Sequence, residues 1–296
     1  MDTKLKKITI NILSLFFLIA LFTINSCRNR NYIDYYNKVN EIDSIYRFQK
    51  DTLKVINQYR KLFRKYEPKN QERIQELETF IKLSSNKHRN FGGKRMLSKL
   101  TLVLAPYGNA YQKHLAIYKQ YGIDSTNIKI EIANWKNNLT KKLVDSFSVA
   151  FVRDQQEERS VKDIMIVNDK KNAELLMLTL ENYGFPSIHK IGIIGNQEVF
   201  MPMDNFLSHM IESEYYPFFK TEILKYVKSG ECPPRYYAVM IDKHNLTVSN
   251  ENILYGAFSS GDTVIDTLKI DKNRKSIGLP TLRHAKKITK DFFKKK

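Results

Sequence analysis

An apolar run near the start of the chain constrains it most. Residues 8–24 read ITINILSLFFLIALFTI, with Lys4, Lys6 and Lys7 before them and a cysteine, Cys27, shortly after. A positive start, an apolar stretch and small polar residues before a break are the pattern of a secretory signal. The run has 17 residues, whereas a membrane-spanning helix needs roughly 20. The pattern therefore favours a signal peptide over residues 1–26, with an uncleaved anchor as the alternative.

The residues INSC, 24–27, resemble the lipobox of bacterial lipoproteins in its looser form. The resemblance implies cleavage before Cys27, a diacylglycerol on its sulfur and a third acyl chain on its amino group. Several chains, each contributing about 0.8 kcal/mol per buried methylene, would anchor the protein lastingly. The alternative is an ordinary signal peptide with a chance cysteine.

Arginines follow Cys27 in RNRNY, where surface-exported lipoproteins of some Gram-negative groups carry an acidic run. By that analogy we expect a membrane-anchored lipoprotein that faces the periplasm, on the inner or the outer membrane.

The other cysteine, Cys232, has no intrachain partner if Cys27 carries lipid. An exported protein without disulfides depends on its core alone for stability. No paired His or Asp pattern marks Cys232 as a nucleophile, so we predict a half-buried structural thiol.

The formal net charge is +18, and removal of residues 1–26 leaves 46 basic and 30 acidic residues, a net charge of +16. Nucleic acid is a common partner of such chains. Three features argue against nucleic acid here. The chain is predicted to be exported, and its lysines are spread along helices. Lysine also outnumbers arginine, whereas bidentate recognition favours arginine. A solvated surface near anionic lipid explains the charge better. The final segment, RHAKKITKDFFKKK, predicts a helix that lies on a membrane or, as we favour, docks on the domain.

Apolar residues recur at helical spacing through most of the chain, which predicts a mainly α fold. Residues 32–66 predict one long helix or two end to end, and Pro106 predicts a break in the helical stretch 97–118. We expect helical hairpins over 27–140 and a mainly α domain over 141–296. Within the latter, NILYGAF and DTVIDTLKI are rich in β-branched residues around the turn SSGD, which predicts one small β-hairpin.

Seven short motifs in the second half occur in a recognisable order. They are DQQEERS, DKKNAELLMLTLENYGFP, IGIIG, FLSHM, YYAVMIDK, LYG and NRKSIGLP, which lie within about residues 145–285. Their order and spacing resemble an uncharacterised bacterial domain family whose pattern contains DQ…R, N…YGWP, QH, YA…DR, YGTQ and RR…GLP. The resemblance implies a fold and a candidate site, but no reaction.

The chain departs from that pattern at several positions. Ser208 replaces the glutamine before the histidine, Lys243 replaces an arginine and Phe185 replaces a tryptophan. Polar positions around the YG pair are apolar here, at Ile253, Ala257 and Phe258. A pocket formed by these positions in relatives would therefore be altered in this chain.

The motif residues supply the site candidates. His209 is a potential general base, with Asp242 to orient its ring, and the alternative is a structural pair that ties two helices. Asp154 and Arg159 are five residues apart on one predicted helix, so we expect each to reach a different partner, in an ion-pair network rather than an anion site. Together with these two, the ligand-binding candidates are Gln155, Asn172, Tyr237, Tyr255 and Arg274.

Metal and nucleotide chemistry find no support in the sequence. The chain has no His-Glu-x-x-His, no Cys-x-x-Cys and no complete phosphate loop, because NFGGKRM lacks the first glycine and the Ser/Thr. We therefore predict no cofactor and no metal. The leading hypothesis is an interaction or scaffold protein of the cell envelope with a possible envelope partner. The alternative is an enzyme or small-ligand-binding domain that uses a His209/Asp242 pocket.

Overall fold

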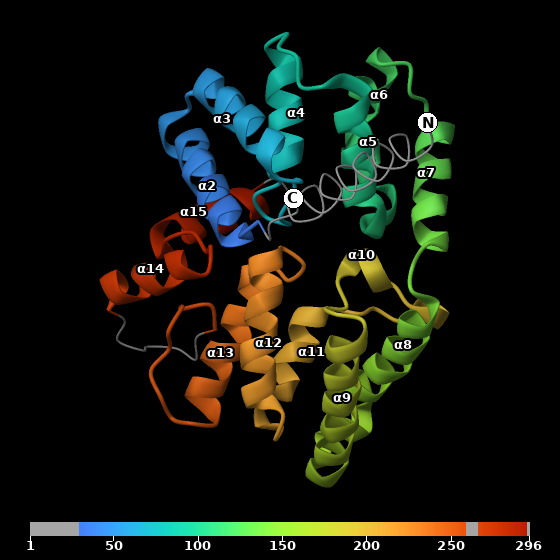
Figure 1. Ribbon diagram of the computed structural model, residues 1–296, viewed down its shortest axis with the longest axis vertical. Coiled ribbons are helices and arrows are strands. Elements are labelled where there is room, and N and C mark those ends of the chain that lie inside the picture. Colours follow the sequence, from blue (N-terminus) through green and yellow to red (C-terminus); the bar gives the residue numbers. More distant parts are fainter. Residues whose placement is uncertain (1–29, 259–265, 295–296) are drawn as a thin grey trace, which may run out of the picture. The chain divides into compact units, whose positions relative to one another are not determined.

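The chain folds into helices that pack side by side, as the apolar spacing predicts (Figure 1). The computed structural model describes residues 30–258 and 266–294. Tyr32–Lys296 form one compact unit. The predicted signal peptide and Cys27 lie outside the described residues, so both remain predictions.

The first helices form a hairpin where the sequence predicted a long helix or two helices end to end. Helix α2 (Tyr32–Ser44) continues into a five-residue π-helical segment, η1 (Ile45–Gln49). Lys50 then adopts a left-handed conformation, with φ 57°. The chain turns there into α3 (Thr52–Lys65), which packs against α2 and whose first turn is capped by Asp51.

The remainder of the first half follows the predicted breaks. It comprises α4 (Glu76–Asn86), α5 (Gly93–Leu104), the 3-10 segment η2 (Ala105–His114), α6 (Leu115–Gln120) and α7 (Ser125–Asn137). Pro106 lies in the first turn of η2, so the helical stretch 97–118 is interrupted there, as predicted. These helices and α2–α3 enclose the first core, which includes Tyr35, Tyr59, Phe80, Leu97 and Tyr118, all below 2 % exposed.

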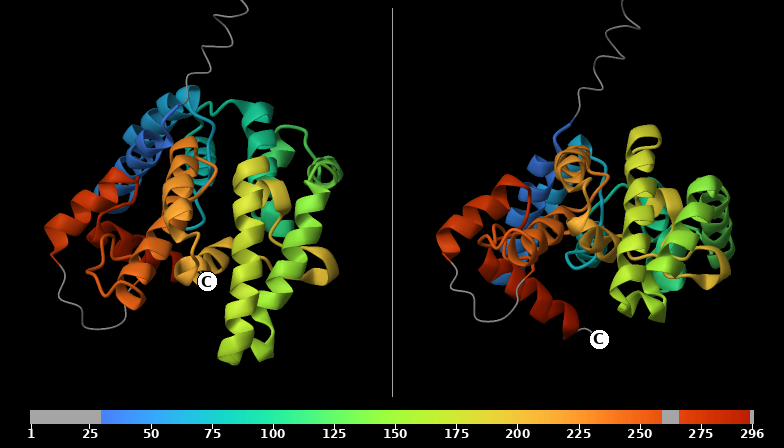
Figure 2. Two further views of the ribbon diagram at one scale, coloured as in Figure 1. Left: turned by 60° about the horizontal axis from the view of Figure 1, so that its bottom comes forward. Right: turned by 90° about the horizontal axis from the view of Figure 1, so that it is seen from below.

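The second half begins with a long antiparallel pair, α8 (Lys141–Gln155) and α9 (Lys162–Asn182), joined by η3 (Glu157–Ser160). We call residues 141–182 the α8–α9 hairpin; Figures 1 and 2 show its two helices side by side. It is followed by α10 (Ile188–Ile191), η4 (Asn196–Glu198), α11 (Met203–His209), η5 (Met210–Glu212), α12 (Tyr216–Ser229) and α13 (Pro234–Thr247). These elements enclose the second core, which includes Phe147, Phe151, Leu176, Phe206 and Phe219.

The predicted β-hairpin is wrong. Among the described residues the structure has no strand, only one isolated bridge between Ile194 and Phe200. Residues 251–258 form an irregular loop whose backbone N–H groups bind a side chain instead of a neighbouring strand. The stretch taken for the second strand ends in a helix, α14 (Thr267–Ser276), which Asp266 caps. The predicted turn SSGD, residues 259–262, lies outside the described part.

The last helix, α15 (Leu282–Phe293), docks on the first core, although it comes last in the chain. Ile288 is buried among first-core residues, and His284 is 5 % exposed. The favoured docked position of the terminal helix therefore agrees with the structure. In the described part of the chain, every helix is too short or too polar to cross a bilayer.

Candidate functional site

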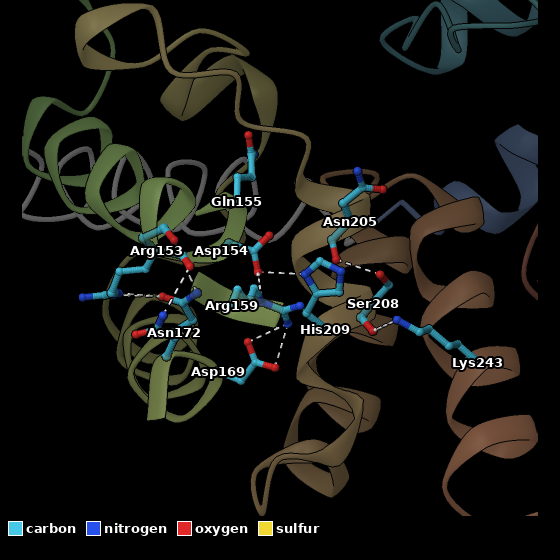
Figure 3. Close-up of polar contacts among 12 residues, drawn as sticks. Arg153, Asp154, Gln155, Arg159, Asp169, Asn172, Asn205, Ser208, His209 and Lys243 are labelled. Atoms are coloured by element: carbon cyan, nitrogen blue, oxygen red, sulfur yellow. Dashed lines mark hydrogen bonds and ion pairs between the residues drawn. The ribbon is translucent and has the colours of Figure 1, made fainter. Parts of the chain in front are cut away.

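The sequence-predicted site residues fall into two separate groups in the structure. Asp154, Gln155, Arg159, Asn172 and His209 belong to the α8–α9 hairpin and α11, where Figure 3 shows most of their contacts. The second group surrounds the irregular loop 251–258 and contains Tyr237, Asp242, Tyr255 and Arg274.

His209 pairs with Asp154 and not with Asp242. Its Nδ1 lies 2.8 Å from Asp154 Oδ1, across 55 positions of sequence (Figure 3). The Asp154 side chain is only 2 % exposed and the His209 side chain is 26 % exposed. Because a carboxylate can only accept, Nδ1 carries the shared proton and the ring orientation is fixed. The pair therefore joins the end of α8 to the end of α11.

Asp154 and Arg159 each reach a different main partner, His209 and Asp169, as expected. They also lie close to each other, because the predicted continuous helix is broken. The helix ends at Gln155, and Gln156 has an extended ψ of 148°, which returns the chain through η3. Arg159 Nε is 3.8 Å from Asp154 Oδ1, and Nη2 donates at 2.8 Å to both carboxylate oxygens of Asp169. Burial raises the pKa of Asp169, and Arg159 offsets part of that rise. Asp169 belongs to the motif DKKNAELLMLTLENYGFP, but the sequence pattern does not mark it as a site residue.

A second polar pair ties the two helices of the hairpin to each other. Arg153 donates through Nε at 3.2 Å and Nη2 at 2.8 Å to Asn172 Oδ1. Asn172 is fully buried and donates to the carbonyl oxygen of Ala150 at 3.3 Å. Gln155 donates to the carbonyl of Phe200 at 3.1 Å. Sequence reasoning missed Arg153, which precedes the motif and carries no signal of its own.

Lys243, one of the departures from the family pattern, serves the end of α11. Its Nζ donates at 2.8 Å to the carbonyl oxygen of Ser208. Burial lowers the pKa of Lys243, and the nearby Arg159 guanidinium lowers it further. The lysine thus satisfies a carbonyl at a helix end, a role that suits a cation.

Contrary to the prediction, Asp242 does not orient the His209 ring but binds the backbone of a loop. It is fully buried on α13. Its Oδ1 accepts the backbone N–H groups of Leu254 and Tyr255 at 2.8 and 2.9 Å. Its Oδ2 accepts those of Ala257 and Phe258 at 2.7 and 3.4 Å. The carboxylate therefore holds the irregular loop in place.

Arg274 holds the same loop through a carbonyl oxygen. Its Nη1 donates to the carbonyl oxygen of Tyr255 at 2.7 Å, and its Nε donates to that of Pro280. Burial lowers the pKa of Arg274 to about 10. The rings of Tyr237 and Tyr255 lie 6.1 Å apart in the same region. Asp242, Arg274 and Tyr237 thus all contact one loop, to which Tyr255 belongs.

Neither group lines either of two cavities of the molecule. A cavity of about 560 Å³ is bordered by residues of the α4–α5 turn and the end of α6, including Arg89 and Gln120. A second, of about 400 Å³, lies between η1, α3 and α15. In the part of the chain that the structure describes, no group of three or more His, Cys, Asp or Glu side chains is arranged to hold a metal ion. Cys232 is fully buried rather than half-buried, and burial raises the pKa of its thiol.

The chemistry available at the first group is that of a partly exposed imidazole with one nitrogen fixed by a buried carboxylate. The same contacts join α8, η3, α9 and α11 into one unit. No known family, curated protein or solved structure matches this chain.

Proposed function

We propose that this protein is a membrane-anchored, periplasm-facing lipoprotein whose helical domain acts as an interaction or scaffold module of the cell envelope. The leader and the INSC segment support the anchor. The observation that carries the interaction role is a concentration of exposed aliphatic side chains on the α8–α9 hairpin.

The described part of the chain has 18 exposed large hydrophobic residues. Six of them are aliphatic residues of this hairpin that fall in one stretch of 19 positions, 149–167. Those on α8 alternate with buried core residues, so they point away from the second core. Exposed apolar side chains gathered in one place mark interaction sites more often than scattered ones do. They are Val149, Val152, Val161, Ile164, Ile166 and Val167, each at least 36 % exposed.

The polar network described above holds this surface rigidly. Asp154, His209, Arg159 and Asp169 fix the connection between α8 and α9 and join it to α11. A surface fixed before binding loses less conformational entropy on association. We therefore propose that the candidate site residues position the hairpin, and that the hairpin binds a protein partner with an aliphatic surface.

Photo-crosslinking in cells that produce the full chain tests this proposal. A benzoyl-phenylalanine at position 152 or 167 should give the same discrete protein adduct, and one at position 53 or 102 should not, because Leu53 and Leu102 are exposed on the other half. The double variant Val149→Asp with Ile166→Asp should abolish the adduct while the thermal unfolding midpoint stays unchanged.

An adduct of twice the chain mass would identify a second copy as the partner. Adducts of equal yield from all four positions, or none from the hairpin, would contradict the interaction role. The anchor is tested separately: cells that produce the full chain should incorporate labelled fatty acid into it, and Cys27→Ser should abolish that labelling.

A second candidate function is small-ligand binding or acid–base chemistry at His209. The observation in its favour is the fixed Nδ1 beside a partly exposed ring, with the Arg159 guanidinium alongside. NMR titration of the His209 ring with inorganic phosphate and acetate tests it. A saturable shift that Arg159→Gln removes would support this candidate, and unchanged resonances would exclude these anions.

A further inference from the structure

The surface formed by η1 and α15 is fixed from beneath by buried charges. Asp43 Oδ2 accepts from Arg47 Nε at 2.6 Å and from His284 Nε2 at 2.8 Å, and the Asp43 and Arg47 side chains are 1 and 5 % exposed. Arg47 Nη1 also donates to Asp291 Oδ2 at 3.0 Å. This network holds α15 at both its first and its last turn. The outward side chains of α15 therefore keep a fixed arrangement relative to η1.

Two aromatic rings and several cations lie on the outward side. Phe48 and Phe293 are 43 and 58 % exposed. The guanidinium of Arg283 lies 5.5 Å above the Phe48 ring. The right-hand view of Figure 2 shows the last helix, in dark red, ending at the margin of the described helices. We call this the η1–α15 surface; it comprises Phe48, Lys50, Arg283, Lys287, Lys290, Phe293 and Lys294.

The cavity of about 400 Å³ opens within this surface. Its cationic members are Arg47, Lys50 and Lys294, and its one acidic member, Asp291, is already paired with Arg47 and with Lys287 at 2.6 Å. The other acidic group nearby, Asp51, accepts from the backbone of Lys54. The full lining is Tyr46, Arg47, Lys50, Thr52, Asp291 and Lys294.

We propose that the η1–α15 surface is a membrane contact that binds anionic phospholipid, with a headgroup phosphate in the cavity and Phe48 and Phe293 in the interfacial layer. Clustered Lys and Arg side chains are attracted to anionic lipid, and aromatic rings settle at the level of the headgroups. The sequence adds Lys295 and Lys296 directly after the described end of α15. The proposal requires neither lipid on Cys27 nor a partner at the α8–α9 hairpin.

The composition of the surface favours lipid over a protein partner. Lysine is depleted in protein–protein interfaces, whereas here Lys50, Lys287, Lys290 and Lys294 surround the rings. The α8–α9 hairpin shows the contrasting composition, with aliphatic side chains gathered on it. The two surfaces therefore suit different partners.

Lipid-borne quenching on the full chain tests the proposal. In a Cys27→Ser background, Gln49→Cys carries an environment-sensitive fluorophore within the surface, since Gln49 is exposed. Cys232 is fully buried and does not take the label. A label at Leu102→Cys, on α5, serves as the control position. Each protein is reconstituted in vesicles of phosphatidylcholine alone or mixed with phosphatidylglycerol, with a quencher on the lipid.

We expect quenching of the Gln49→Cys label only when phosphatidylglycerol is present, and relief of quenching as salt rises. Each cation near an anionic membrane strengthens attraction about fivefold. Lys50→Gln with Lys294→Gln should therefore weaken the contact about twenty-five-fold. The matched double variant Lys129→Gln with Lys136→Gln, which removes two exposed charges from α7, should leave it unchanged.

Three results would overturn the proposal. The first is an unquenched Gln49→Cys label in phosphatidylglycerol vesicles, which a purely protein-binding surface would give. The second is equal quenching in phosphatidylcholine alone, which would reflect the apolar leader. The third is an equal loss in the α7 control variant, which would reflect net charge only. None of these results bears on the crosslinking experiment at the hairpin.

Discussion

The carboxylate of Asp242 provides a quantitative test of the structural role assigned to the second group of candidates. In Asp242→Asn the side chain keeps its shape, loses its charge and replaces one oxygen by an NH2 group. The remaining oxygen can still accept from Leu254 and Tyr255, but the NH2 group then faces the N–H of Ala257, now 2.7 Å from Oδ2. Two donors that face each other cannot form a hydrogen bond.

The cost follows from the hydrogen bonds lost. Hydrogen bonds to a charged group contribute about 1.5–3 kcal/mol each, and a buried donor left without a partner costs about 1–3 kcal/mol. Weakening of two bonds and loss of the Ala257 bond should therefore lower the free energy of unfolding by about 3–5 kcal/mol. His209→Ala removes one bond from the buried Asp154 carboxylate, beside which the Arg159 guanidinium remains. We therefore expect a smaller cost, of about 1–2 kcal/mol.

Urea unfolding of residues 28–296, followed by far-ultraviolet circular dichroism, measures both values. Asp145→Asn is the matched control, because Asp145 is exposed and accepts only an exposed side-chain bond from Asn196. The control should stay within about 0.5 kcal/mol of the parent protein. Hydrogen exchange should show faster exchange at Leu254 and Ala257 in Asp242→Asn.

A loss below about 1 kcal/mol in Asp242→Asn would refute this reasoning, because the carboxylate would then contribute little to the loop. A stabilising substitution would go further and indicate that Asp242 is kept for function at the expense of stability. The loop that Asp242 holds would then be the place to test for ligand binding.

Three other predictions follow from buried groups. Burial raises the pKa of Glu76 from 4.5 to about 7. The stability that its protonated form contributes is therefore complete below pH 4.5 and is lost as pH rises through 7. Glu76→Gln should make the free energy of unfolding fall by about 3 kcal/mol less over this pH range, as measured by urea unfolding. Gly278→Ala, with φ 87° and an added Cβ 2.7 Å from the Tyr36 side chain, should lower the free energy of unfolding by about 2 kcal/mol or more in thermal unfolding. Gly122→Ala, with φ 67° at a helix end and only Lys94 Nζ, at 3.9 Å, within 4 Å, should cost about 1 kcal/mol. The thiol of Cys232 should react with a thiol reagent only on unfolding, and rapid reaction of the native chain would contradict its burial.

Local patterns in the sequence were sufficient to predict most helices but not the β-hairpin. The spacing of Val55, Ile56, Tyr59 and Leu62 predicts α3, because burial on one helical face is a local property. Residues 252–258 have the composition of a strand, yet a strand needs a neighbour for its N–H groups. Asp242 takes those groups instead, and a contact across 12 or more positions leaves no periodic signal.

The candidate site shows the same limit. The order of the motifs made Asp154, Arg159 and His209 candidate site residues, and the structure brings all three together. The approach of Arg159 to Asp154 depends on the break at Gln156, a single residue with extended ψ. Sequence spacing predicted a continuous helix there, which placed Asp154 and Arg159 on different faces. The predicted pairing of His209 with Asp242 came instead from the analogy with a catalytic dyad, which spacing cannot test.

The contacts of the motif residues bear on how function should be sought in this chain. Asp154, Asn172, His209, Asp242 and Arg274 each bond another segment of the same chain. Substituting these residues will therefore change the stability of the fold and the position of the hairpin, so any effect on binding would be indirect. The two surfaces proposed to bind partners consist largely of residues outside the quoted motifs, and substitutions there leave both cores intact. Loss of binding from a surface substitution at unchanged stability is thus the evidence that can assign a function, whereas loss of activity from a motif substitution cannot.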